Sequence, residues 1–319
     1  MSNASQSQTN VTSEQEFQGL TERVLLCTLA TLLCCVLLFI NGVMLFTLRS
    51  KAAFCDTSRY ILLFNLLFAD TVQMALCHLL YLIAACRTTL TYPVCGVLNM
   101  LAVLTNDVSP LTLVVMSLER YVAVCYPLRH AAIITVRNAG VAVLVVWAFS
   151  SLNVFTRVLL LLRFPFKHLE NLQMKEFCSD LAMFLDSVSN HYNKAYTCFL
   201  FISAGVVITS SFIGVMIAAR SAFTDEASAQ KARNTLLLHL VQLGLTLFST
   251  ILNPVLTALS TVVTRIVLVR VHIFFYMCFC IFPRCLSSLI YGVRDQTIRP
   301  ILMYYLCRQL KLPIVSTYT

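Results

Sequence analysis

The sequence predicts an all-α membrane protein, a bundle of seven membrane-spanning helices followed by a short amphipathic helix. Hydrophobic residues make up 59% of the 319 residues and charged residues only 12%, about half the charge of a typical soluble domain. A helix needs about 20 apolar residues to cross a bilayer. Seven stretches meet that length, at residues 24–48, 60–86, 95–118, 138–162, 197–219, 235–260 and 271–292. Stretches this long favour helices over a membrane β-barrel, whose strands are short and alternating.

The seven stretches leave only short connectors, so residues 23–292 are expected to form one membrane domain. A polar tail, residues 1–22, precedes this domain, and residues 293–319 follow it. The connectors have no room for a soluble catalytic lobe, and the six histidines are dispersed along the chain. The sequence therefore predicts that the protein is not an enzyme, and no cofactor is expected.

Loop charges indicate how the chain crosses the membrane. Lysine and arginine are enriched in the loops on one side, which the positive-inside rule assigns to the cytoplasm. The C-terminus is then inside the cell and, with an odd number of spans, the N-terminus is outside. The two N-x-Ser/Thr sequons, at Asn3 and Asn10, lie in the outer tail and are predicted glycosylation sites. The net charge of +9 comes from scattered loop residues, so a multi-pass plasma-membrane protein is predicted and not a nucleic-acid-binding one.

The 14 cysteines do not form a metal-binding pattern. Many lie inside apolar stretches, where cysteine is an ordinary small buried side chain, and no C-x-x-C pair occurs. Cys95 opens the third stretch, and Cys178 is the only cysteine of the long loop 163–196. A disulfide between these two cysteines fits an oxidising outer compartment.

Four charged residues fall inside predicted spans, where charge is costly and indicates a functional position. Asp70 and Arg284 lie too deep in their stretches for their side chains to reach the membrane surface. Arg157 is nearer a span end and has that option. Asp107 has two interpretations, since it can meet a cationic ligand or pair internally with Arg157.

The inner end of the third stretch carries the most distinctive motif. Residues 116–130 read MSLERYVAVCYPLRH. Adjacent Glu119 and Arg120 at a helix end can act as a lock, because the glutamate satisfies the arginine while the bundle is closed. Opening of the bundle then frees Arg120 for a partner.

This block resembles the third-helix signature of odorant receptors, particularly the fish type, within the rhodopsin-like (class A) G-protein-coupled receptors. The resemblance covers roughly residues 20–306, with further matches at residues 41–42, 66–70, 95, 147, 231–233 and 289–294. The chain departs from the class at Ser287 and Ser288, where Asn-Pro is usual. Pro283, one turn earlier, is the expected source of the kink.

The resemblance implies two sets of signalling residues. Glu119, Arg120, Tyr121 and Tyr291 correspond to the positions that control G-protein coupling. An intramembrane polar network is expected from Asn41, Asp70, Ser109, Arg284 and Ser287. Related receptors commonly coordinate sodium at the carboxylate that corresponds to Asp70. Because an unpaired arginine at that depth is costly, we expect Arg284 to pair with Asp70 instead.

The resemblance places a ligand pocket in the outer half of the bundle, between the third, fifth, sixth and seventh helices. The candidates are mostly apolar, which suits a small, partly hydrophobic molecule. They are Asn99, Val103, Asn106, Asp107, Phe201, Ser203, Val255, Leu259, Ile273 and Met277. Each could equally be a packing residue. Retinal is excluded because a Schiff-base opsin needs a lysine in the seventh span, where this chain has none.

Residues after the seventh stretch predict the short amphipathic helix. Ile298, Ile301, Leu302 and Tyr305 recur at helical spacing, so one face of that helix is expected to lie on membrane lipid. Cys307 is a candidate palmitoylation site.

The resemblance implies an odorant receptor that binds a small-molecule odorant or metabolite and activates a heterotrimeric G protein. The expected subunit is the olfactory-type stimulatory one, which raises cyclic AMP. The alternative within the class is a non-olfactory receptor for a small metabolite. A transporter is disfavoured, because transporters tend to have paired repeats with broken helices, and no such symmetry is evident here.

Overall fold

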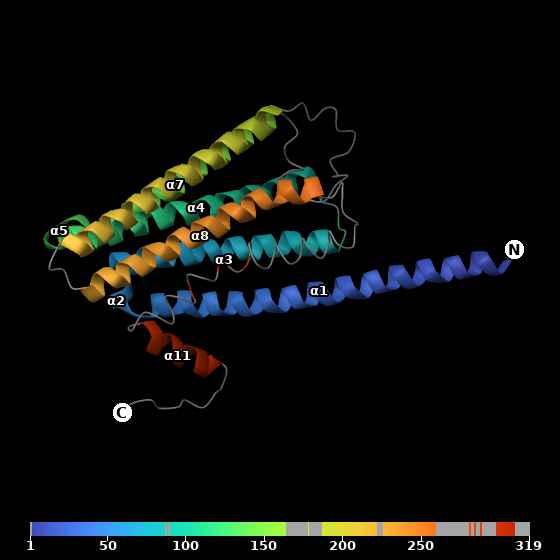
Figure 1. Cartoon of the computed structure of the whole chain (residues 1–319), viewed down its shortest axis with the longest axis horizontal. Helices are drawn as coiled ribbons and strands as arrows, with labels where there is room; N and C mark the ends of the chain where they lie inside the picture. Colours follow the sequence, from blue (N-terminus) through green and yellow to red (C-terminus); the bar gives the residue numbers. More distant parts are fainter. Residues whose placement is uncertain are drawn as a thin grey trace.

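The chain is a bundle of long α-helices (Figure 1). The computed structural model describes residues 2–86, 88, 90–163, 178, 187–221, 226–259, 281, 284, 288 and 298–309. The helices there are α1 Ser2–Ser50, α2 Ala52–Cys55, α3 Ser58–Ala85, α4 Tyr92–Cys125, α5 Pro127–Ile133, α6 Val136–Leu162, α7 Ser187–Ser221, α8 Glu226–Leu259 and α11 Ile298–Gln309.

Five of these helices are long and apolar enough to cross a membrane. They contain the segments Cys27–Ser50, Ser58–Ala85, Tyr92–Cys125, Val136–Leu162 and Ser187–Ala218, which agree with the first five predicted stretches. Helix α8 includes residues 235–259 of the sixth stretch. The seventh, 271–292, lies outside the described residues except for Ile281, Arg284 and Ser288.

Local sequence explains several helix ends. Proline at the first turn of a helix costs nothing, because its missing N–H has no intrahelical acceptor there, and α4 and α5 both carry proline in the first turn, at Pro93 and Pro127. Thr135 caps α6 by accepting a hydrogen bond from the backbone N–H of Asn138 at 3.1 Å. Helix α1 extends through the predicted tail and projects beyond the bundle toward the N-terminus (Figure 1).

Helix α4 is the centre of the arrangement, since it contacts α3, α6, α7 and α8. The main core cluster joins buried residues from several helices, including Met44 of α1, Leu66 of α3, Met116 of α4 and Ile208 of α7. Helix α11 packs against α1. Its Ile298 and Leu302 belong to this core cluster and Ile301 packs against it, so these residues face the bundle, whereas the sequence predicts that they lie on lipid.

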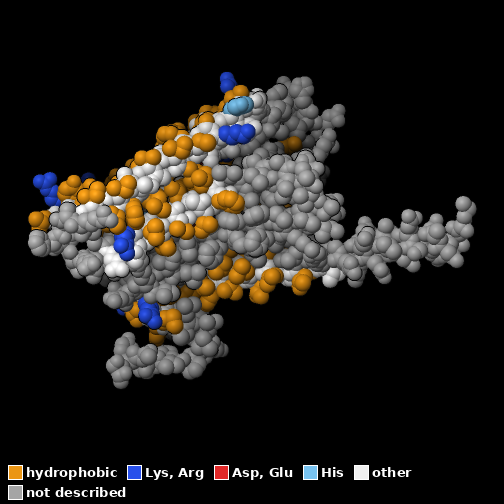
Figure 2. All heavy atoms as spheres, viewed as in Figure 1, with side chains coloured by type: hydrophobic (Ala, Val, Ile, Leu, Met, Phe, Trp, Pro, Cys, Tyr) orange, Lys and Arg blue, Asp and Glu red, His pale blue; other side chains and the backbone are white. Residues whose placement is uncertain are grey.

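The exterior of the spanning helices is strongly apolar. Large hydrophobic side chains such as Leu25, Leu144 and Ile202 are about two-thirds exposed. Figure 2 shows hydrophobic side chains along the helices, while the visible lysine and arginine side chains lie toward the ends of the bundle. Apolar surface on this scale is unusual in a soluble protein and suits contact with lipid tails.

Candidate functional site

A buried ion pair lies at mid-depth in the bundle. Arg284 donates through Nη1 to Oδ1 of Asp70 at 2.9 Å, with both side chains almost wholly buried. This is the pairing that the sequence predicts. The other end of the guanidinium, Nη2, donates to Oδ1 of Asn106 on α4 at 2.6 Å. On α8, Gln242 approaches Oδ2 of Asp70 at 3.5 Å.

Of the remaining residues of the predicted polar network, only one described residue reaches the ion pair. Ser109 on α4 lies beside the Asp70 carboxylate, within hydrogen-bonding reach. Asn41 on α1 is fully buried, and its amide makes no hydrogen bond within the described part of the chain. Ser287 lies outside the described residues, while its neighbour Ser288 is buried. The structure therefore brings together Asp70, Ser109 and Arg284.

At the inner end of α4, Glu119 and Arg120 form the pair that the motif predicts. Nε of Arg120 lies 3.0 Å from Oε2 of Glu119, and both side chains are mostly buried. His130 of α5 approaches the other carboxylate oxygen at 3.9 Å. His239 of α8 is buried within electrostatic range of Arg120. Arg120 is thus paired with Glu119 of its own helix and lies near His239 of α8.

Tyr121 fills the junction of α4, α7 and α8. Its ring packs with Phe212 against buried Val215 and Leu236, and it meets the ring of Tyr126 edge-on, with centroids 6.0 Å apart. It also lies directly over Gly214 of α7, where a Cβ atom would collide with the ring. A residue without a side chain is therefore what allows α7 to approach Tyr121 so closely.

A second polar cluster is buried in the half of α4 that carries the disulfide. Asn153 of α6 donates to Oδ2 of Asp107 at 2.6 Å and accepts from the hydroxyl of Tyr192 on α7 at 3.1 Å. Arg157 donates to the amide oxygen of Asn193. These bonds join α4, α6 and α7, and they provide amide partners to both charged residues whose roles the sequence left open.

The other pocket candidates are placed as follows. Asn99 is buried on α4, and Val103 is half-buried there. Phe201 packs in the main core cluster, and Ser203 donates to its own helix at the carbonyl of Leu200. Asn106, as described above, is bound by Arg284. Val255 and Leu259 belong to α8, but their side chains lie outside the described part, as do Ile273, Met277 and Tyr291 altogether.

The predicted disulfide is present. Cys95 in the first turns of α4 is bonded to Cys178, with Cα atoms 5.6 Å apart. Both cysteines are buried. The predicted modification sites Asn3, Asn10 and Cys307 lie in helices α1 and α11, and their side chains are outside the described part.

Neutral polar residues contribute contacts that the sequence reasoning missed. Trp147 of α6 donates to Oδ1 of Asn65 on α3 at 2.8 Å, and the amide nitrogen of Asn65 donates to Thr112 on α4 at 2.9 Å. Thr105 of α4 donates to Gln73 of α3 at 2.5 Å. The available signal was an amide inside an apolar stretch, which is nearly as informative as a charge when no water is present.

The sequence as a whole matches the 7 transmembrane receptor (rhodopsin family) over residues 40–291. The chain therefore belongs to that family, and the bundle is that of a multi-pass receptor of the plasma membrane. It is similar to Odorant receptor 131-2 of Danio rerio, with 32% identity over 271 residues that cover 85% of this chain and 82% of the relative. It is also similar to Olfactory receptor 52A1 of Homo sapiens, with 32% identity over 197 residues, 59% of this chain and 60% of the relative. The chain is thus an olfactory-type member of the family.

Proposed function

We propose that this protein is an odorant receptor that binds a small extracellular molecule and activates a heterotrimeric G protein. The partner expected is the olfactory-type stimulatory Gα subunit, which raises cyclic AMP. The observation that supports this most directly is the buried Glu119–Arg120 pair at the end of α4, with His239 of α8 beside it. A mostly buried cation that is paired within its own helix and faces a neighbouring helix is suited to a switch that opens when the two helices separate.

The proposed mechanism is a shift between closed and open bundles. A ligand moves this equilibrium only if it binds the open form more tightly than the closed one. Separation of α8 from α4 would expose Arg120 and Tyr121. The C-terminal helix of Gα would then enter the groove between the helix ends, a helix-in-groove contact.

The proposed architecture has seven spans, with the N-terminus outside the cell and the C-terminus inside. The Cys95–Cys178 disulfide supports the outer assignment of that end of α4, because disulfides persist in oxidising compartments. The ligand would enter from this end. Buried Asn99 and Asp107 on α4 are the polar residues proposed to meet the ligand, which Asp107 would do while it also accepts from Asn153.

A cyclic AMP reporter in cells that co-express the olfactory-type stimulatory Gα tests the proposal. A panel of amino acids, amines, nucleotides, steroids and bile acids would be applied to the wild type and to Arg120→Ala. Arg137→Ala provides the matched control, because Arg137 is an exposed arginine in the first turn of α6. A ligand-dependent rise that Arg120→Ala abolishes and Arg137→Ala retains, with equal surface expression, is expected. A response that Arg120→Ala leaves intact contradicts the mechanism.

A further inference from the structure

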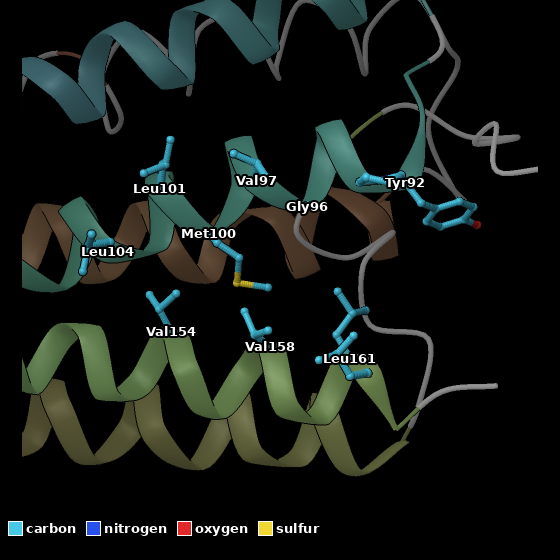
Figure 3. A pocket seen from close by; sticks show the side chains of 11 residues that line it. Tyr92, Gly96, Val97, Met100, Leu101, Leu104, Val154, Val158 and Leu161 are labelled. Carbon is cyan, nitrogen blue, oxygen red and sulfur yellow. The ribbon is translucent and has the colours of Figure 1, made fainter. Parts of the chain in front are cut away.

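An apolar groove lies on the outside of the bundle between α4 and α6. Its volume is about 560 Å³. Figure 3 shows Val154, Val158 and Leu161 pointing from α6 toward α4, with Met100 reaching from α4 into the space between the helices. Among the described residues that line it, only Tyr92, at the end of the groove near the disulfide, has a side chain able to donate a hydrogen bond. A water-soluble ligand therefore has almost nothing to bind along its length.

The groove opens away from the bundle axis. Val97, Leu101 and Leu162, which line it, are 62%, 44% and 66% exposed. The polar residues of the same segment of α4, Asn99 and Asp107, are buried on its other faces. The groove is therefore separate from the proposed odorant pocket, and in a bilayer it faces the hydrocarbon region.

The end of the groove has the chemistry of a membrane interface. Arg163 directly follows the lining residue Leu162 at the end of α6 and is exposed. Its guanidinium is suited to a phosphate, which it binds through paired N–H donors. Tyr92 stands at the same end, and tyrosine is enriched where the apolar and polar zones of a membrane meet.

We propose that this groove binds one acyl chain of a glycerophospholipid, with the headgroup phosphate at Arg163 and Tyr92. The orientation rests on the proposed topology, which places this end of α4 and α6 in the outer leaflet. An acyl chain in the groove would contact both α4 and α6 where their side chains leave a gap between them. Val154 and Val158 directly follow Asn153 and Arg157 along α6, so the bound lipid would support the helix whose Asn153 bonds to Asp107.

Photolabelling of the full chain in nanodiscs tests this proposal. The probe is phosphatidylcholine with a diazirine in one acyl chain, and labelled positions are mapped by mass spectrometry after photolysis. Labelling is expected to concentrate on peptides that contain Met100 and Val158 and to be weak around Leu144, a 70% exposed residue of α6 outside the groove. Equal labelling of Leu144 and Val158 would overturn the proposal, because it indicates ordinary annular lipid.

Two variants test the binding sites of the acyl chain and of the headgroup separately. Val158→Trp fills the groove and is expected to lose the labelling, whereas Leu144→Trp makes the same change on bare lipid-facing surface and is expected to keep it. Arg163→Gln leaves the apolar wall intact and is expected to reduce labelling by the phospholipid probe. A diazirine sterol that labels the groove equally well, together with no effect of Arg163→Gln, would overturn the assignment to a phospholipid. None of these measurements needs an odorant or a G protein, so their failure is distinct from failure of the proposed function.

Discussion

Arg284 and Asp70 form an ion pair across the interior of the bundle, with 2.9 Å between Nη1 and Oδ1 and with 5% and 0% of the two side chains exposed. Arg284 belongs to the seventh predicted stretch and Asp70 to α3. Because the same guanidinium also reaches Asn106 of α4, one side chain links three segments. The positive charge at this carboxylate is therefore supplied by the protein's own chain.

Removal of Arg284 alone is expected to be more damaging than removal of both partners. Arg284→Leu leaves Asp70 buried without its cation, which costs about 3–5 kcal/mol of stability, whereas replacing a whole buried pair is often close to neutral. Thermal unfolding of the purified receptor and surface staining should therefore rank Arg284→Leu below the double variant Asp70→Asn, Arg284→Leu. Equal loss in the single and double variants would mean that the pair is not the source of the stability.

Gly214→Ala and Gly205→Ala are expected to change stability in opposite directions, although both lie in α7. A Cβ at Gly214 collides with the ring of Tyr121, while nothing lies within 4 Å of a Cβ at Gly205. Overpacking typically costs about 1–3 kcal/mol, and alanine in an open helical position gains up to about 1 kcal/mol over glycine. Thermal unfolding checks both values.

The loss of stability caused by Gly214→Ala is expected to vanish when the ring of Tyr121 is absent. In a Tyr121→Ala background, Gly214→Ala should cost nothing further, since the two residues are in contact and couple. Additive losses in the double variant would show that Gly214 is required for another reason.

Trp147→Phe is expected to destabilise the protein by about 1–3 kcal/mol, because it leaves Oδ1 of buried Asn65 without its donor. The phenyl ring retains most of the apolar contact, so the loss reports mainly the hydrogen bond. Phe155→Leu, at an exposed position on the same helix, serves as the control and should change the melting temperature little. A Trp147→Phe variant as stable as the wild type would show that this hydrogen bond does not stabilise the fold.

Loss of the disulfide is expected to cost about 2–5 kcal/mol. Cys95→Ser, Cys178→Ser and the double variant should lower the melting temperature by the same amount, because each breaks the same bond. Cys198→Ser alters a free, exposed cysteine and should have no effect. A greater loss in the double variant would indicate that the cysteines contribute separately.

Glycosylation of the N-terminal tail tests the topology. The protein from membranes is expected to gain mobility on a gel after glycosidase treatment, and Asn3→Gln with Asn10→Gln should abolish that change. Ser5→Ala with Thr12→Ala should have the same effect, since it destroys both sequons while keeping the asparagines. An untreated wild type that already runs like the double variant would argue against an outer N-terminus.

The sequence was enough to predict properties that depend on one stretch or on one pair of residues. The first five spans follow from the length of each apolar stretch, which the bilayer thickness sets. The partners Asp70 and Arg284 follow from the high cost of an isolated charge in a low-dielectric interior. The Cys95–Cys178 bond follows from the small number of cysteines available at one end of the bundle. In each case few alternatives were physically acceptable.

The tertiary structure alone decided which neutral polar side chains meet. Asn65 bonds to Trp147 and Thr112, and Asn153 bonds to Tyr192, yet any of these groups could satisfy many partners. The sequence likewise left Asp107 open between a ligand and Arg157, and it assigned Asn106 to a pocket, whereas Arg284 binds it. The outcome depends on the rotation and register of each helix against its neighbours. Those quantities come from the packing of the whole bundle and cannot be read from one helix at a time.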